Sequence, residues 1–209
     1  MCACTVAPVP TAPSALATAH MPAADGFEPA FYRAFLQNGF ESPDRLEPVR
    51  ILPGPFRLYL KTVADDGRAI DQVTLDTTEQ VLLHIAGTWS GETYGVIAIE
   101  RGRSSRERVP GWITVKWTSS FAAGTCGRST VGVDGGFIEL DASGACSCGM
   151  ATRVYPRLVR HELGHAMGYY HTDDAADVMY GRTVSAEACD LLPSDRERRH
   201  ARFAYSGLR

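Results

Sequence analysis

Hydrophobic and polar positions alternate along the chain in patterns that predict a series of short helices and strands. After Pro29, apolar residues recur at the three- and four-residue spacing of a helix, and Asn38-Gly39 follows as a signal for its end. The pattern predicts a short amphipathic helix at the start of the folded part. Its apolar side chains are expected to belong to the core and not to a cofactor site: Phe31, Tyr32, Phe35 and Leu36.

Four segments have the pattern of β-strands. Residues 56–61 alternate with period two between Pro55 and the turn residues 65–67, which is typical of a half-buried strand. Residues 94–99 and 112–117 predict two further strands, and residues 137–140 predict a short fourth. A loop rich in glycine and cysteine separates the last two.

A helix is predicted after the first strand. Asp76 or Thr77 can cap it, and Glu79 or Gln80 is placed to complete a capping box. Its apolar face carries Val81, Leu82, Ile85 and Trp89. His84 lies in this helix without another residue at metal-ligand spacing, so we interpret it as an ordinary packed or surface histidine.

Two more helices are predicted in the second half of the chain. One runs from about residue 153 to 167, with Val154, Leu158 and Val159 at core spacing, and the last begins at Ser194, with Glu197 three positions later. The element order, and the absence of an internal repeat, favour an α+β (mixed α/β) fold with a mixed sheet backed by helices. A sandwich or a helical bundle fits this order less well.

Length and composition limit the domain organisation. A chain of 209 residues with 44% apolar residues fits one domain, or one domain with an arm. The first 30 residues hold five prolines among alanine and threonine, a composition that buries too little to fold. We therefore expect a flexible arm over residues 1–30 and a folded domain over residues 31–209.

Charge and hydropathy disfavour two classes of partner. The net charge of −3 provides no broad positive field, so a nucleic acid is a poor candidate. No apolar run approaches the roughly 18–20 residues that a membrane-spanning helix needs. Ala15-Leu16-Ala17 resembles a signal-peptidase site, but prolines interrupt the apolar segment before it and no basic residues lead it. The arm could be the remnant of a signal, or a lipid tether at Cys2 or Cys4, and the sequence leaves both open.

The cysteines allow two interpretations. Cys126, Cys146 and Cys148 could form a thiolate metal site, or a disulfide could link a glycine-rich loop in an oxidising compartment. We favour the disulfide because no paired C-x2-C motif is present, although six cysteines, Cys189 included, leave the pairing undetermined. This interpretation supports an extracellular or cell-surface location.

The strongest chemical signal is the run His161-Glu162-Leu163-Gly164-His165 within a predicted helix. Residues four apart on a helix lie on one face, so both imidazoles can reach a single metal ion. Glu162 is rotated by about 100° from His161 and can approach a metal-bound water without ligating the ion itself.

A third ligand must come from beyond the helix. Gly168 can adopt a positive φ, end the helix and return the chain so that His171 reaches the same ion. Three protein ligands leave one position for water, which is typical of a catalytic zinc. We expect His161, His165 and His171 to be the zinc ligands.

The full pattern, from His161 through Gly168 to His171, resembles the zinc signature of the metzincin metallopeptidases. Met179, eight residues after His171, is similar to the methionine turn of the matrixin branch. The resemblance covers residues 55–207 and is strongest over 158–180. It implies a metzincin-like zincin fold: a twisted mixed sheet of four to five strands, a backing helix, an active-site helix, and a small C-terminal subdomain with one helix. Residues 135–141 resemble the family's edge-strand segment above the cleft.

The sequence also departs from the matrixin pattern. Tyr180 follows Met179 directly, so the fifth ligand of astacin-type enzymes is not implied, and Gly181 replaces the usual proline. The structural zinc and calcium segment has no counterpart, so the sequence does not support calcium, although it leaves binding open at Asp134, Glu139 or Asp141. The cysteine-switch motif is absent, which disfavours Cys2 or Cys4 as a latency thiolate.

These features predict a zinc-dependent endopeptidase that acts on a peptide or protein substrate, as a monomer without a membrane span. Glu162 is expected to act as general base and then general acid on a metal-activated water. An extended substrate is expected to pair with an edge strand at residues 137–140. The alternatives are a catalytically silent zinc-binding scaffold, which the intact Glu162 disfavours, and a zinc hydrolase of a non-peptide amide.

Overall fold

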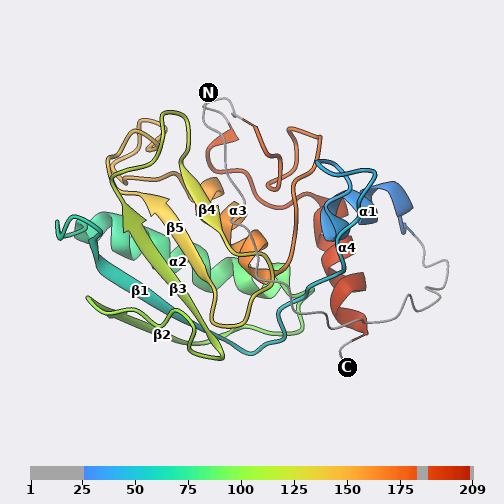
Figure 1. Ribbon diagram of the computed structural model, residues 1–209, viewed down its shortest axis with the longest axis horizontal. Helices are drawn as coiled ribbons and strands as arrows, with labels where there is room; N and C mark the ends of the chain where they lie inside the picture. Colours follow the sequence, from blue (N-terminus) through green and yellow to red (C-terminus); the bar gives the residue numbers. More distant parts are fainter. Residues whose placement is uncertain (1–25, 183–187, 208–209) are drawn as a thin grey trace.

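The computed structural model describes residues 26–182 and 188–207. In this part of the chain, five strands form one sheet and four α-helices accompany it (Figure 1). This confirms the predicted mixed α+β class. The elements, in chain order, are α1 (Pro29–Gln37), β1 (Phe56–Ala64), α2 (Gln72–Trp89), β2 (Val96–Gly102), β3 (Trp112–Thr118), β4 (Gly127–Ser129), β5 (Phe137–Asp141), α3 (Pro156–Met167) and α4 (Asp195–Ser206).

The sheet is mixed and has the strand order β2-β1-β3-β5-β4. β1 pairs in parallel with β2 and β3, and β3 pairs in parallel with β5, whereas β4 runs antiparallel to β5. α2 packs against β1 and β2, and α3 packs against β4 and β5. Because α2 and α3 also pack on each other, both cover the same face of the sheet (Figure 1). The main core lies between this face and the two helices.

The expectation that residues 137–140 form an edge strand is wrong. β5 lies between β3 and β4, and the edge on this side is β4, within the loop rich in glycine and cysteine. β4 has only three residues, and two of them, Gly127 and Ser129, belong to types that do not signal a strand. Its position therefore comes from pairing with β5 and not from its own sequence pattern.

α2 begins earlier than its sequence pattern suggested. Asp71, and not Asp76 or Thr77, caps the helix, because its side chain accepts a hydrogen bond of 2.8 Å from the backbone N–H of Thr74. The reason is that the buried face extends one turn further toward the N-terminus than predicted. The buried residues of α2 are Thr74, Leu75, Thr78, Leu82, Ile85, Ala86 and Trp89, whereas Val81 is half-buried.

The other helices match their predictions closely. α1 ends at Asn38, whose φ of 58° is left-handed, and α3 begins at Pro156, three residues later than expected. α4 begins after Ser194, and the capping box between Ser194 and Glu197 is present. α4 lies beside α1 (Figure 1), where the ring of His200 packs 4.7 Å from that of Phe31.

Among the cysteines of the described residues, two disulfides are present, Cys126–Cys146 and Cys148–Cys189, with Cα–Cα distances of 5.7 and 6.4 Å. They confirm the disulfide interpretation over a thiolate metal site. Cys126 immediately precedes β4, so the first disulfide ties the start of this edge strand to the loop after β5. The second joins that loop to the segment before α4.

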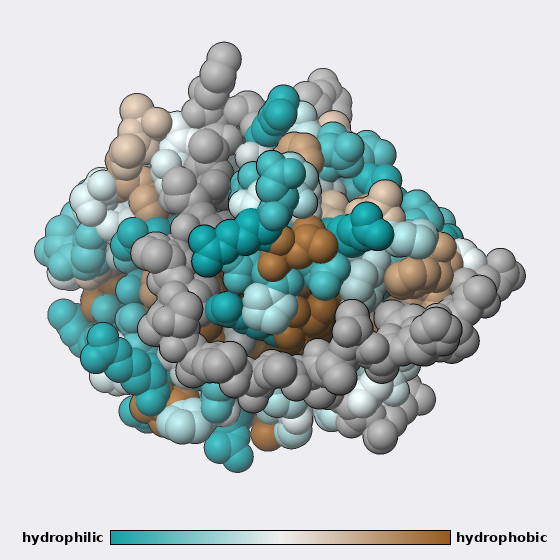
Figure 2. All heavy atoms as spheres, turned by 45° about the vertical axis from the view of Figure 1, so that its right-hand side comes forward, coloured by the Kyte–Doolittle hydropathy of each residue, from teal (hydrophilic) through white to brown (hydrophobic). Residues whose placement is uncertain are grey.

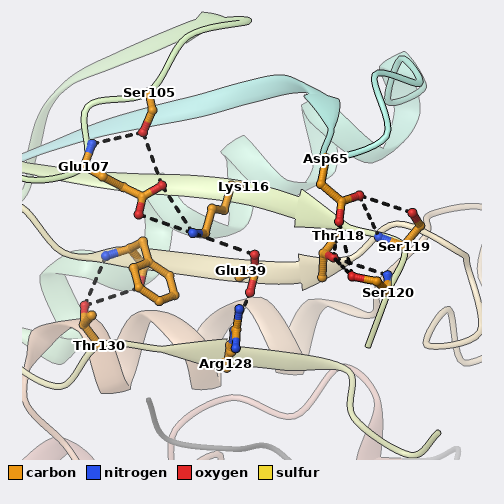
Figure 3. A network of polar contacts seen from close by, with 11 residues as sticks. Asp65, Ser105, Glu107, Lys116, Thr118, Ser119, Ser120, Arg128, Thr130 and Glu139 are labelled. Atoms are coloured by element: carbon orange, nitrogen blue, oxygen red, sulfur yellow. Dashed lines mark hydrogen bonds and ion pairs between the residues drawn. The ribbon is translucent and has the colours of Figure 1, made fainter. Parts of the chain in front are cut away.

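A row of charged side chains crosses the face of the sheet that the helices leave uncovered (Figure 3). Glu139 on β5 accepts a hydrogen bond from Arg128 on β4 and lies 3.7 Å from the ammonium nitrogen of Lys116 on β3. Because Arg128 and Glu139 are also paired in the ladder, this contact supports the register of the short edge strand.

No helix in the described ranges is long and apolar enough to cross a membrane. The large apolar side chains that stay exposed there are scattered over separate elements, for example Val73 and Leu83 on α2 and Ile97 on β2. Figure 2 shows polar and apolar residues interleaved on the face that it draws. Cys2, Cys4 and the signal-like segment lie outside the described residues, so the structure does not test the expectations for them.

The disulfides predict the outcome of thiol counting. In a Cys2→Ser/Cys4→Ser variant made under oxidising conditions and then denatured, we expect almost no free thiol, because the four remaining cysteines are paired. Reduction is expected to lower the free energy of unfolding by about 3 kcal/mol per bond, since each bond closes a loop of 20 residues or more. Four reactive thiols in the unreduced variant would contradict the pairing.

A pH-dependent contribution is predicted for Asp65, which follows β1. Hydrogen bonds from the hydroxyl of Thr118 and the N–H of Ser119 lower the pKa of Asp65 to about 2 (Figure 3). A lowered folded-state pKa gives stability that is complete above the unfolded value of 3.8 and is lost as the pH falls through 2. Urea unfolding should show wild type more stable than Asp65→Asn at pH 6, with the difference shrinking toward pH 2. A difference that is constant with pH would refute this assignment.

Candidate metal centre

The three histidines of the motif converge on one point. His161 and His165 lie one turn apart on α3, and His171 returns to them after the helix ends. The Nε2 atom of His165 lies 3.1 Å from the Nε2 atoms of both His161 and His171. All three side chains are buried, and within the described ranges no other group of three histidine, cysteine or acidic residues could hold a metal ion.

The second nitrogen of each ring has an acceptor. Nδ1 of His161 lies 2.8 Å from the carbonyl oxygen of Val178, and Nδ1 of His165 lies 2.7 Å from that of Tyr169. Nδ1 of His171 lies 2.6 Å from a carboxylate oxygen of Glu41. Since carbonyl and carboxylate oxygens only accept, each Nδ1 carries the proton, and the three Nε2 lone pairs face one another.

This donor set fits a divalent metal ion such as zinc. Burial, together with the neighbouring His171, lowers the pKa of His161 to about 3, and burial lowers the pKa of His165 well below its usual value. Both rings are therefore neutral at neutral pH, which is the state that ligates a metal. Three converging lone pairs repel one another, and a cation between them would turn this repulsion into attraction.

The return of the chain depends on Gly168. Its φ is 114°, and its N–H bonds to the carbonyl oxygens of Gly164 and His165, which ends α3. A Cβ atom at Gly168 would lie 2.0 Å from the carbonyl oxygen of Arg50, which passes against the end of the helix. Glycine is thus required both for the backbone conformation and for the close approach of another segment.

Met179 lies against α3, the helix that carries His161 and His165. It is fully buried, and a Cβ atom at Gly164 would lie 2.5 Å from its sulfur, so the glycine inside the helix gives the methionine its space. The backbone N–H of Thr172 donates to the carbonyl of Met179 over 2.9 Å, which closes the turn. Gly181 leaves space for the ring of His171 in the same way, since a Cβ atom at this position would lie 2.7 Å from Cγ of His171.

Glu197 holds this turn from α4. Its two carboxylate oxygens accept hydrogen bonds from the backbone N–H groups of Val178 and Met179, at 3.0 and 2.8 Å. Burial, with a smaller effect of the nearby Asp177, raises the pKa of Glu197 to about 7. Asp177 is itself paired with Arg196. Sequence reasoning identified Glu197 only as a capping residue and missed this contact.

Glu162 lies between the histidines and the edge of the sheet. It is fully buried, and the hydroxyl of Ser129 on β4 donates to its Oε2 atom over 2.7 Å. A Cβ atom at Gly127 would lie 2.5 Å from its Oε1 atom, so the carboxylate fills the space that this glycine leaves. The sequence carried no signal for Ser129, Gly127 or Glu41, because each reaches the site through a contact between distant segments.

The other candidate positions do not gather into a site. Asp134 accepts from the N–H of Gly111, Glu139 pairs with Arg128 and Lys116, and Asp141 accepts from the loop that follows it. Calcium at these residues therefore gains no support. His84 is exposed on α2, as expected of an ordinary histidine.

Comparisons with known proteins give only distant matches. No protein-family model and no curated protein match the chain. The structure is similar to that of metalloproteinase-II from Bacteroides fragilis, at 12% identity over 75% of this chain and 56% of that one, with a TM-score of 0.49. A chaperone–substrate complex matches at 10% identity over 76% of this chain and 35% of the other, with a TM-score of 0.42. These likenesses are too distant to assign a function to the chain.

The role of Gly168 can be tested with a matched glycine. We expect Gly168→Ala to lower the free energy of unfolding by more than about 2 kcal/mol. The alanine would be strained by the positive φ at this position, and its Cβ atom would overlap with the carbonyl oxygen of Arg50. Gly67→Ala is the control, because Gly67 has a φ of 84° and no neighbour within 4 Å of its Cβ position. Urea unfolding measures both variants. Equal losses would show that the Arg50 contact contributes nothing.

Proposed function

We propose that this protein is a zinc-dependent endopeptidase. The observation that carries the proposal is the convergence of three buried Nε2 atoms, of His161, His165 and His171, with the buried Glu162 directly after His161 on the same helix. These imidazoles are the residues that would hold the ion. When bound, zinc would supply a Lewis acid that polarises a carbonyl and makes water acidic enough to lose a proton near neutral pH.

Glu162 is proposed as the general base and then the general acid. Its carboxylate accepts a proton from water and delivers it to the leaving amine, so that one side chain serves both steps. The hydroxyl of Ser129 donates to Oε2 over 2.7 Å, which helps to hold the carboxylate in one orientation. The carboxylate is buried, which restricts its orientation.

The edge strand β4 is proposed as the substrate-binding strand. Cys126 and Thr130 bond through their backbones to β5, so by the alternation of an antiparallel pair the backbone groups of Gly127 and Ser129 point away from β5. No other described strand lies on that side. An extended peptide can add there, and its backbone would then pass beside Glu162. This replaces residues 137–140 as the proposed substrate edge.

Two alternatives remain from other classes: a zinc-binding scaffold without activity, and a hydrolase of a non-peptide amide. The position of β4 favours the peptidase, because a strand edge beside the base suits an extended backbone. The pairing of the described cysteines is consistent with an extracellular protein, and a monomeric state is part of the proposal.

The test is a peptide-library digest read by mass spectrometry, with and without a zinc chelator. We expect wild type to cleave peptides and the chelator to abolish cleavage. Glu162→Ala is expected to keep bound zinc and to lose about 100- to 10,000-fold in rate, because it lacks the proton carrier.

The matched controls are two histidine variants. His161→Ala should lose zinc, whereas His84→Ala, at an exposed histidine on α2, should keep both zinc and cleavage. Cleavage by Glu162→Ala at the wild-type rate would refute its role. Zinc binding without any peptide cleavage by wild type would favour the scaffold.

A further inference from the structure

Of the three histidines, His171 has a charged partner on its far nitrogen. Its Nδ1 atom donates to Oε1 of Glu41 over 2.6 Å, whereas the Nδ1 atoms of His161 and His165 donate to neutral backbone carbonyls. Glu41 precedes His171 by 130 positions and belongs to the segment that follows α1. The motif itself therefore does not include this contact.

The segment that carries Glu41 is anchored on both sides of it. Before it, the carbonyl of Phe35 accepts from the N–H of Tyr170 over 2.8 Å, and the ring of Phe35 stacks on Tyr169 at 4.3 Å. After it, the N–H of Leu52 donates to the carbonyl of Met167 over 3.1 Å. All three contacts are made with residues 167–170, at the end of α3, so Glu41 is presented to His171 by a fixed part of the fold.

The ring of His171 is held on two sides. Gly181 lies against its face, at a spacing that leaves no room for a Cβ atom. Glu41 holds Nδ1, which fixes the rotation of the ring and the position of the proton. The carboxylate of Glu41 is 42% exposed while the ring is 1% exposed, so the carboxylate reaches a buried ring from the solvent side.

We propose that Glu41 is a positioning residue for metal binding: it holds His171 in the orientation and tautomer that direct Nε2 toward the ion. This rests on the proposed metal centre, but not on peptide hydrolysis. The carboxylate also adds a negative charge near the cation and makes the ring more electron-rich, and both effects strengthen ligation. It acts through His171 and does not ligate the ion itself, since Nδ1 lies on the far side of the ring.

The experiment measures zinc affinity by competition with a chromogenic chelator. We expect Glu41→Ala to bind zinc about 10- to 100-fold more weakly than wild type, as is typical when the hydrogen-bond partner of a ligating histidine is lost. Glu41→Gln should lie between the two, because its amide oxygen still accepts from Nδ1 but carries no charge. The visible spectrum of the Co²⁺-substituted protein should change in Glu41→Ala, since the geometry of one ligand changes.

The matched control is Glu47→Gln, a carboxylate of the same segment that lies 3.5 Å from Arg50 instead of a histidine. It should bind zinc as wild type does. The proposal is overturned if both Glu41 variants bind zinc within twofold of wild type, or if Glu47→Gln weakens binding as much as Glu41→Gln. Circular dichroism and the melting temperature verify folding, and Glu41→Gln decides the matter if Glu41→Ala fails to fold.

The same measurements separate this inference from the proposed function. Zinc binding by wild type and its loss in His171→Ala test the metal centre, and the peptide digest tests hydrolysis. The ratio of zinc affinities between wild type and the Glu41 variants can be measured whether or not the protein cleaves peptides.

Discussion

The structure of the site depends on bringing the Nε2 atoms of three imidazoles to one point. Nε2 of His165 lies 3.1 Å from its two counterparts. The far nitrogens hold the rings in this arrangement, since each is bonded to a different segment: the turn at Val178, the end of α3 at Tyr169, and the segment after α1 at Glu41. Three separate parts of the fold therefore hold the histidine rings in place.

The sequence predicted the features that depend on neighbours along the chain. The spacing of His161 and His165, the helix end at Gly168 and the capping box at Ser194 follow from helix geometry and backbone preference, and the structure has them as expected. The start of α2 was missed because Asp71, Asp76 and Thr77 are all plausible caps, and only the packing of its first turn selects Asp71.

Features that depend on distant residues could not be predicted. β4 has three residues, and its place at the sheet edge comes from pairing with β5 and from the disulfide at Cys126. Ser129 reaches Glu162 across 33 positions, and Glu41 reaches His171 across 130. Glu197 shows both cases, since its capping bond is local, whereas its bonds to the backbone of Val178 and Met179 depend on how α4 packs.

The placement of β4 bears on the proposed peptide hydrolysis in two ways. A substrate added to this edge would be aligned by the backbone of Gly127 and Ser129. The same two residues contact the carboxylate of Glu162: Gly127 leaves space for it because it has no side chain, and the hydroxyl of Ser129 donates a hydrogen bond to it. A shift of β4 by one residue would turn Ser129 to the other face of the sheet and bring Arg128 toward Glu162. The pairing of Arg128 with Glu139 opposes such a shift. In the proposed peptidase, the register of these three residues would set both the alignment of the substrate and the surroundings of Glu162, although the motif on α3 contains none of them.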